Sequence, residues 1–356
     1  PISIPKTFVD NLNLVIIQVK ALFAVFITRM EAYADQPCMA FTYIQPAEPT
    51  TVGYRLAQTA QDLNEDLQDL IRVHASIRGK GMKGAVGTSA SYTELLRGTG
   101  ITASQLEAMV MKDLGLEAYT AATQVYTRKQ DLRIGQALSS LCATLYKFFI
   151  DFRLLQSPPI GEWSEPFGAK QVGSSAMPFK RNPINSEKID SLCRFVEAQE
   201  SVLWQNAAST LLERTLDDSA NRRLVLPELF LSVDEILSTA IKVVHGMQVH
   251  RAGIERNLAS YGIFAASERL LMELGKNGAN RQEMHELIRE HSLCAWAEVQ
   301  AGKPNTLKQM LCEDATIRAY LQKEAIEALL DANQYIGDSP ERTRKVIEEI
   351  RDVLSR

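Results

Sequence analysis

The eleven residues GSSAMPFKRNP, at positions 173–183, combine groups that could bind and activate a small anionic molecule. Ser174 and Ser175 carry hydroxyls, and Lys180 and Arg181 can pair with carboxylates. The glycine at the start of this loop permits a tight turn. Two interpretations are open: an anion-binding loop, or an ordinary polar connection between helices, since serine and lysine are common in loops.

The end of this loop has the signature of a helix start. Asn182 is predicted to be the N-cap, and Pro183 the first helical residue. The first amides of a helix are unpaired and carry partial positive charge, so an anion would be stabilised there.

Three further segments combine glycines, hydroxyls and cations. They are FTYIQPAEPTTVGYR (41–55), RGKGMKGAVGTSAS (78–91) and ERTLDDSANRR (213–223). The glycines of the second segment would let its backbone amides approach an anion closely, and the arginines of the third could clamp a phosphate. Alternatively, the third segment is a charged helix start in which Asp217 and Asp218 neutralise the arginines.

The elements that position these segments are predicted from apolar residues that recur every three or four positions. Heptad seams run from Leu56 to Ile77 and from Ile134 to Leu155. Long helices are predicted at 12–30, 56–77, 134–155, 183–213 and 224–250. Loops are predicted at the glycine- and proline-rich breaks 45–53, 79–88, 157–183 and 214–223. Alternating strand patterns are nearly absent. Five long helical patterns without strands predict an all-α bundle.

Shorter helices are predicted in the last part of the chain. Their positions are 264–274, 280–299, 304–311 and 314–332. We therefore expect a long-helix bundle domain over residues 1–250, carrying the loops, and a smaller helical domain over residues 251–356. The broad apolar faces favour subunits that pack bundle against bundle, and a monomer with a thick core is the alternative.

Composition excludes several classes of function. The 39 basic and 43 acidic residues give a net charge of −4 without long runs of one sign, so no nucleic-acid-binding stripe is expected. Five scattered cysteines without a CxxC pair predict neither a disulfide framework nor a metal site, and favour a reducing, cytoplasmic compartment. The apolar stretch Leu12–Ile27, interrupted by Gln18 and Lys20, is expected to be too short for a membrane span.

Taken together, the segments resemble a known family. The loop at 173–183 resembles the GSSxMPxKxNP loop of the fumarase/aspartase superfamily. The segments that resemble the adenylosuccinate lyase family within it are QPAEPTTVGYR (45–55), KGAVGTSAS (83–91), QVYTRK (124–129), ERTLDDSANRR (213–223) and GANRQEMHELIRE (278–290). The resemblance starts near residue 38, and the family implies an additional N-terminal segment of about a hundred residues, the size of a small domain.

The resemblance implies a homotetramer in which loops of three subunits form each active site. It implies a β-elimination that releases fumarate from a succinyl-amine, acting on small nucleotide substrates of purine synthesis without a metal or organic cofactor.

Catalytic roles are carried over by resemblance to matching positions. Ser174 is implied as the base that takes the Cβ proton, with Ser175 as the alternative. Lys180 and Asn182 are placed to stabilise the dianionic intermediate, and Glu187 matches the family's glutamate.

Substrate contacts are implied in the same way. The positions are Gln124 for the substrate, Arg214, Ser219 and Arg223 for its phosphate, and Thr88 and Ser89 for a carboxylate. Lys188 stands where some members have a substrate-contacting arginine, and it keeps the charge but loses the planar fork. Tyr43 stands where the family has the histidine that protonates the leaving nitrogen. Tyrosine has a reference pKa of about 10, further from neutrality than the value of about 6.5 for histidine.

Other functions remain open at this stage. The substitution at Tyr43 would suit a catalytically silent helical scaffold of the same fold. Argininosuccinate lyase and fumarase are the competing enzymes within the superfamily, and the segment at 213–223 disfavours both.

Overall fold

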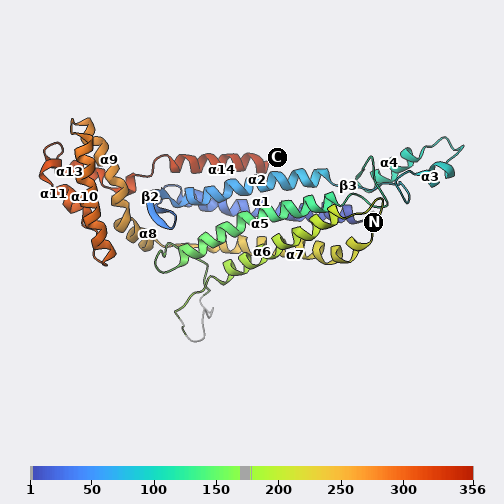
Figure 1. The fold of residues 1–356 in the computed structure, drawn as a ribbon, viewed down its shortest axis with the longest axis horizontal. Coiled ribbons are helices and arrows are strands. Elements are labelled where there is room, and N and C mark those ends of the chain that lie inside the picture. Colours follow the sequence, from blue (N-terminus) through green and yellow to red (C-terminus); the bar gives the residue numbers. More distant parts are fainter. Residues whose placement is uncertain (1–2, 169–176, 178, 356) are drawn as a thin grey trace. The chain divides into compact units, whose positions relative to one another are not determined.

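The computed structural model describes residues 3–168, 177 and 179–355, and helices make up most of it (Figure 1). The long helices are α1 (Ser3–Tyr33), α2 (Val52–Ser76), α5 (Lys129–Gln156), α6 (Ile184–Ala208) and α7 (Asp217–Gly246). Each coincides with most of one predicted long helix. The prediction of an all-α, long-helix bundle is therefore confirmed.

The chain forms two compact units. The first comprises residues 1–25, 59–153 and 167–246, and the second comprises residues 26–58, 154–166 and 247–356. These units are discontinuous in sequence, and α1, α2 and α5 contribute residues to both. The division into domains at residue 250 follows chain order instead, and it stays a prediction.

Buried apolar seams hold the first unit together. Leu63 and Leu67 of α2, and Leu141 and Leu145 of α5, are at most 1% exposed. Full burial of one such side chain contributes about 1.5–3 kcal/mol. The heptad spacing therefore predicted the inward faces of these helices correctly.

The helices α6 and α7 run antiparallel beside each other (Figure 1). Near the end of α6, the side-chain amides of Asn206 and Asn221 exchange hydrogen bonds of 2.8 and 3.0 Å. Near its start, Lys188 forms an ion pair of 2.6 Å with Glu235. The beginning of α7 therefore lies beside the end of α6.

The helix α1 has a core face despite its strongly apolar composition. By length and composition, its segment Ile4–Tyr33 could cross a membrane, so the expectation that this stretch is too short is wrong. Its Leu12, Val19 and Phe23 are fully buried within the protein. A buried core helix passes the same length test, which makes the test weak evidence for a membrane span.

Short elements at one end of the first unit were not predicted. They are β3 (Arg78–Gly79), α3 (Ala90–Leu95), α4 (Ala103–Asp113) and β4 (Glu117–Ala118), with β3 and β4 paired in parallel. A capping box starts α4: Gln105 N donates to Thr102 Oγ1 at 3.2 Å, and Thr102 N donates to Gln105 Oε1 at 2.8 Å.

The second unit combines a hairpin with shorter helices. The strands are β1 (Pro37–Thr42) and β2 (Gln45–Thr51), with β5 (Trp163–Ser164) and β6 (Gln248–Val249) forming a second antiparallel pair. The helices are α8 (Arg251–Asn257), α9 (Ile263–Lys276), α10 (Arg281–Gln300), α11 (Leu307–Glu313), α12 (Ala315–Arg318), α13 (Lys323–Leu329) and α14 (Ser339–Ser355), with a π-helical turn at Leu258–Gly262 and a 3₁₀ turn at Ala332–Gln334.

Several predicted boundaries are wrong. The single helix expected at 314–332 is divided into α12, α13 and the 3₁₀ turn, so that Ile317, Ile326 and Leu330 all reach the same buried cluster. The expected loop at 45–53 contains β2, and the expected loop at 214–223 contains the first turns of α7.

The predicted cap of α6 is displaced by one residue. The N-cap is Pro183, whose ψ of 60° is not helical, and the first helical residue is Ile184. Asn182 therefore lies outside the helix and is not its N-cap.

Candidate active site

The predicted site residues fall into three groups in the structure. Gln124, Thr88, Ser89, Arg214, Ser219 and Arg223 lie at the end of the first unit where α7 begins, Lys180, Asn182, Glu187 and Lys188 lie around the start of α6, and Tyr43 belongs to the second unit. Ser174 and Ser175 lie outside the described residues.

A cavity of about 460 Å³ opens beside the first turns of α7. This volume lies within the range of small-molecule sites, about 300–1,000 Å³. Its polar wall includes Arg128, Arg214, Ser219, Arg222 and Arg223. Its apolar wall comes mainly from α1 and α7 and includes Phe8, Leu226, Pro227 and Phe230. The structure thus brings together the three residues predicted to bind phosphate.

A buried carboxylate fixes two of the four arginines. Asp218 accepts hydrogen bonds from Arg128 Nε and from Arg214 Nη1, the latter at 2.8 Å, and its side chain is 1% exposed. Burial alone would raise the pKa of Asp218, but Arg128 and Arg214 outweigh it and hold that pKa below its usual value. The alternative interpretation of this segment is thus partly correct, since Asp218 does neutralise an arginine.

A second buried carboxylate fixes the third arginine. Arg222 Nε donates to Asp131 Oδ2 at 2.6 Å, and Arg222 Nη2 donates to Tyr126 Oη at 2.6 Å. Tyr126 in turn donates to Asp131 Oδ1 at 2.9 Å. Burial would lower the pKa of Arg222, but Asp131 and Tyr126 outweigh it and raise that pKa. Arg222 is therefore held charged and in a fixed orientation within the cavity wall.

Arg223 differs from the other three arginines. It is exposed, and among the described residues it has no ion-pair partner. Within the described chain, two paired carboxylates, Asp131 and Asp218, serve the four guanidiniums of the cavity wall. The wall therefore carries an excess of about two positive charges, and the planar forks of arginine suit a phosphate.

The glycine-rich loop and Gln124 are close to this end of the unit. Gln124 is exposed, and its backbone N donates to Glu213 O at 3.2 Å, next to Arg214. Gly87 has a φ of +90°, and a Cβ there would lie 1.8 Å from Ala122 O, so only glycine permits this approach to the segment that carries Gln124.

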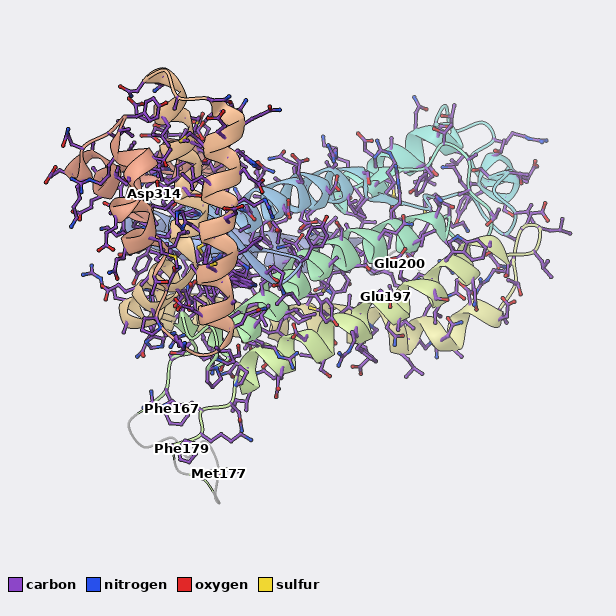
Figure 2. All side chains as sticks on the ribbon, turned by 60° about the vertical axis from the view of Figure 1, so that its left-hand side comes forward. Phe167, Met177, Phe179, Glu197, Glu200 and Asp314 are labelled. Atoms are coloured by element: carbon purple, nitrogen blue, oxygen red, sulfur yellow. The ribbon has the colours of Figure 1, made fainter. Side chains whose placement is uncertain are left out.

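A different set of charges surrounds the start of α6. Figure 2 shows Phe167, Met177 and Phe179 on the loop that leads into this helix. Arg181 lies over the ring of Phe167 at 4.9 Å, and Lys180 is exposed, with its backbone N bonded to Met177 O. The interpretation that Lys180 could meet an anion is therefore compatible with its position.

Glu187 lies in the first turn of α6 and contacts Arg153 of α5 at 3.4 Å. Arg153 Nη1 also donates to Asp190 Oδ2 at 2.8 Å. The hydrogen bond that Arg153 donates to Asp190 raises the pKa of Arg153, and Asp190 itself is only 1% exposed. Lys188 is engaged with Glu235 in this structure.

The phosphate cavity and the start of α6 lie far apart in one chain. The 25 residues of α6 span about 37 Å at 1.5 Å per residue. Arg223 follows Asn221, which bonds to Asn206 at the end of α6, whereas Lys180 and Glu187 lie at its beginning. A single copy of the chain therefore does not combine these two groups around one small molecule.

Tyr43 occupies the tip of the β1–β2 hairpin. Tyr43 and Ile44 form a two-residue turn in which both φ values are positive, 53° and 60°. The Tyr43 side chain is 97% exposed. This position therefore presents its phenol to solvent rather than packing it into the second unit.

Sequence reasoning did not assign the residues that hold these groups in place. Tyr126 and Arg128 lay within the quoted segment QVYTRK but received no role, and Asp131, Arg153 and Asp190 were not singled out. Tyr126, Arg128, Asp131 and Asp190 are buried by packing between distant segments, so no local signal distinguished them. Arg153 was missed because its role depends on its pairing with Glu187 and Asp190 of another helix. Among the described residues, no group of three or more His, Cys, Asp or Glu side chains is arranged to hold a metal ion.

Comparisons with known proteins identify the family. Residues 7–197 match the family described as "Lyase", and residues 264–346 match "Adenylosuccinate lyase C-terminus". Over 340 residues the chain is 39% identical to the adenylosuccinate lyase of Schistosoma mansoni, covering 94% of this chain and 69% of the relative. The chain belongs to the adenylosuccinate lyase family.

Other members of this family are similarly related. The adenylosuccinate lyase of Archaeoglobus fulgidus is 32% identical, with 97% of this chain and 75% of the relative covered. That of Schizosaccharomyces pombe is 37% identical, with 89% of this chain covered, and the chain spans 65% of that relative's length.

Solved structures show the same fold. The 3-carboxy-cis,cis-muconate lactonizing enzyme from Pseudomonas putida has a TM-score of 0.86 at 23% identity, with 99% of this chain and 75% of that chain covered. The fumarate lyase from Mesorhizobium sp. BNC1 has a TM-score of 0.78 at 20% identity, with 95% and 73% covered. These similarities establish the fold but do not identify the substrate.

Proposed function

We propose that this chain is an adenylosuccinate lyase, which eliminates fumarate from adenylosuccinate to give AMP and from succinylaminoimidazole carboxamide ribotide in purine biosynthesis. The observation that carries this proposal is the cavity beside α7, with four arginines and two carboxylates paired to them. A phosphate monoester carries nearly two negative charges at neutral pH, which matches the excess of about two positive charges on the cavity wall. Argininosuccinate has no phosphate, so the cavity favours the nucleotide substrates.

The proposed elimination needs a base and an acid on the two sides of the bond that breaks. Ser174, or its neighbour Ser175, removes the Cβ proton, and the electron pair forms the C=C bond of fumarate as the C–N bond breaks. Tyr43 gives a proton to the leaving nitrogen. Lys180 and Asn182 stabilise the anionic intermediate, because a serine is a poor base without such charge.

The remaining predicted residues would hold the substrate. Arg214, Ser219 and Arg223 bind the phosphate, supported by their shared place on the cavity wall. Thr88 and Ser89 contact a carboxylate of the succinyl group. Gln124 and Lys188 also contact substrate, and Glu187 orients the groups at the start of α6. No metal or organic cofactor takes part in this scheme.

The active form is proposed to be a cytoplasmic homotetramer with shared active sites. The roughly 37 Å length of α6 supports this, because it separates Lys180 from Arg223 in one chain. A neighbouring subunit would bring the missing group to each cavity. Light scattering tests this proposal: a tetramer is expected, and a stable monomer at micromolar concentration would contradict it.

Turnover of adenylosuccinate tests the proposed function. Purified protein should change the ultraviolet absorbance of adenylosuccinate and release an equal amount of fumarate. Ser174→Ala should abolish both signals while AMP still binds, because the phosphate cavity is unchanged. If Ser175→Ala is the inactive variant instead, the base is the second serine. A protein that binds AMP but never releases fumarate would be a silent scaffold.

A further inference from the structure

The glycine-rich loop is anchored by a carboxylate from a neighbouring helix. Glu107 of α4 lies 2.5 Å from Lys83 Nζ through both of its oxygens. Glu107 Oε2 also accepts a hydrogen bond from Met82 N at 2.8 Å. The side chains of Lys83 and Glu107 are 8% and 17% exposed. One carboxylate therefore fixes both the side chain and the backbone of the loop at residues 82–83.

The same two loop residues fix Ser89. Ser89 N donates to Lys83 O at 2.9 Å, and Ser89 Oγ donates to Met82 O at 3.2 Å. Ser89 has a left-handed φ of 56°, which costs energy and persists because these bonds hold it. The loop thus folds back on its own anchored segment.

Thr88 is the part of this loop that remains accessible. It is exposed, and both neighbours are held: Ser89 by the bonds to Met82 and Lys83, and Gly87 by its close approach to Ala122 O. Its hydroxyl oxygen accepts a hydrogen bond from Ala90 N at 3.4 Å, which leaves the hydroxyl proton able to donate to a ligand.

The charges of this loop favour an anion. Lys80 Nζ donates to Gly84 O at 2.5 Å, so two lysines and one glutamate lie within the fold of the loop. Burial, together with the neighbouring Lys83, lowers the pKa of Lys80. Glu107 bonds to Lys83 and Met82. Among the described residues, Lys80 therefore has no carboxylate partner.

We infer that Glu107 is a positioning residue for the substrate: acting through Lys83, Met82 and Ser89, it holds Thr88 where the threonine hydroxyl binds a carboxylate of the succinyl group. This inference rests on the proposed function. Glu107 touches the loop and not the substrate, so its removal should affect carboxylate binding more than phosphate binding.

The test compares Glu107→Gln with the parent in the full chain. Glutamine keeps an acceptor for Met82 N but loses the charge that holds Lys83. We expect kcat/KM for adenylosuccinate to fall on the order of 10-fold or more, with weaker inhibition by fumarate and unchanged affinity for AMP. Glu94→Gln is the matched control: Glu94 of α3 forms an exposed ion pair with Arg97, which follows this helix, so the substitution should leave all three quantities unchanged.

A second variant keeps the test valid if Glu107→Gln does not fold. The double substitution Lys83→Met with Glu107→Met replaces the pair by apolar side chains of similar length, which is often neutral for stability. It should show the same selective loss. Equal losses of fumarate and AMP binding, or no loss of either, would overturn the inference. Absence of turnover by the parent would instead contradict the proposed function.

Discussion

At the scale of single residues, the phosphate cavity shows two adjacent arginines with different surroundings. The sequence segment ERTLDDSANRR predicted that its arginines gather around an anion, and the structure places them on one cavity. The sequence could not show that Arg222 faces inward and Arg223 outward. Successive residues of a helix point about 100° apart, and the side that becomes buried depends on Tyr126 and Asp131 from a distant segment.

Replacement of these two arginines by methionine should separate binding from stability. Arg223→Met should weaken AMP binding by about 10-fold or more, because a charge-assisted hydrogen bond contributes about 1.5–3 kcal/mol, with little change in unfolding. Arg222→Met should destabilise the fold by about 3–5 kcal/mol, because the buried carboxylate of Asp131 would lose its ion-pair partner. Calorimetry measures AMP affinity, and denaturant titration measures the free energy of unfolding. Similar stabilities of the two variants would contradict the assignment of a structural role to Arg222 and a binding role to Arg223.

Tyr43 allows a test of the proposed proton donor. Because its side chain is 97% exposed, Tyr43→His should cost little stability. If this position holds the general acid, turnover should rise by about 10²- to 10⁴-fold, since histidine gives and regains a proton near neutral pH. Steady-state kinetics measure the gain. No gain, with substrate still bound, would contradict the expectation that histidine is the better proton donor at this position.

At the scale of elements, long helices were predictable and the hairpin was not. The helices α2 and α5 repeat apolar residues over many turns, so their patterns were strong. The hairpin strand β2 contains Pro46 and Pro49 and no alternating pattern, and its turn has Tyr43-Ile44 where Asn-Gly is typical of two positive φ values. Tyrosine and isoleucine rarely adopt positive φ values, so the residue preferences of the turn argue against a hairpin at this position.

Relief of this backbone strain should stabilise the protein. A left-handed conformation costs a residue other than glycine about 1–2 kcal/mol, and Ile44 is β-branched and 67% exposed. Ile44→Gly should therefore raise the free energy of unfolding by about 0.5–1 kcal/mol after the entropic cost of glycine. Ile44→Val keeps the strain and should leave stability unchanged. Thermal unfolding compares them, and a lower melting temperature for the glycine variant would contradict this explanation.

At the scale of the whole molecule, the sequence suggested a set of candidate site residues but not the distances between them. The loop at 173–183 and the segment at 213–223 are joined by a single helix, and only its length shows that Lys180 and Arg223 belong to opposite ends. Within one chain, the cavity that contains Arg223 therefore lacks Lys180, and the start of α6 lacks the phosphate-binding arginines. Assembly of several copies therefore becomes part of the proposed chemistry.

Mixing two inactive variants tests this central claim most directly. Lys180→Met removes the charge near the start of α6, and Arg223→Met removes the phosphate contact at the other end, so each variant alone should have little activity. After the two are dissociated and reassembled together, shared sites should recover about one quarter of the parent's activity, because random pairing leaves that fraction of sites with both residues intact. No recovery in mixed oligomers of confirmed composition would show that each site lies within one chain, and would contradict the account.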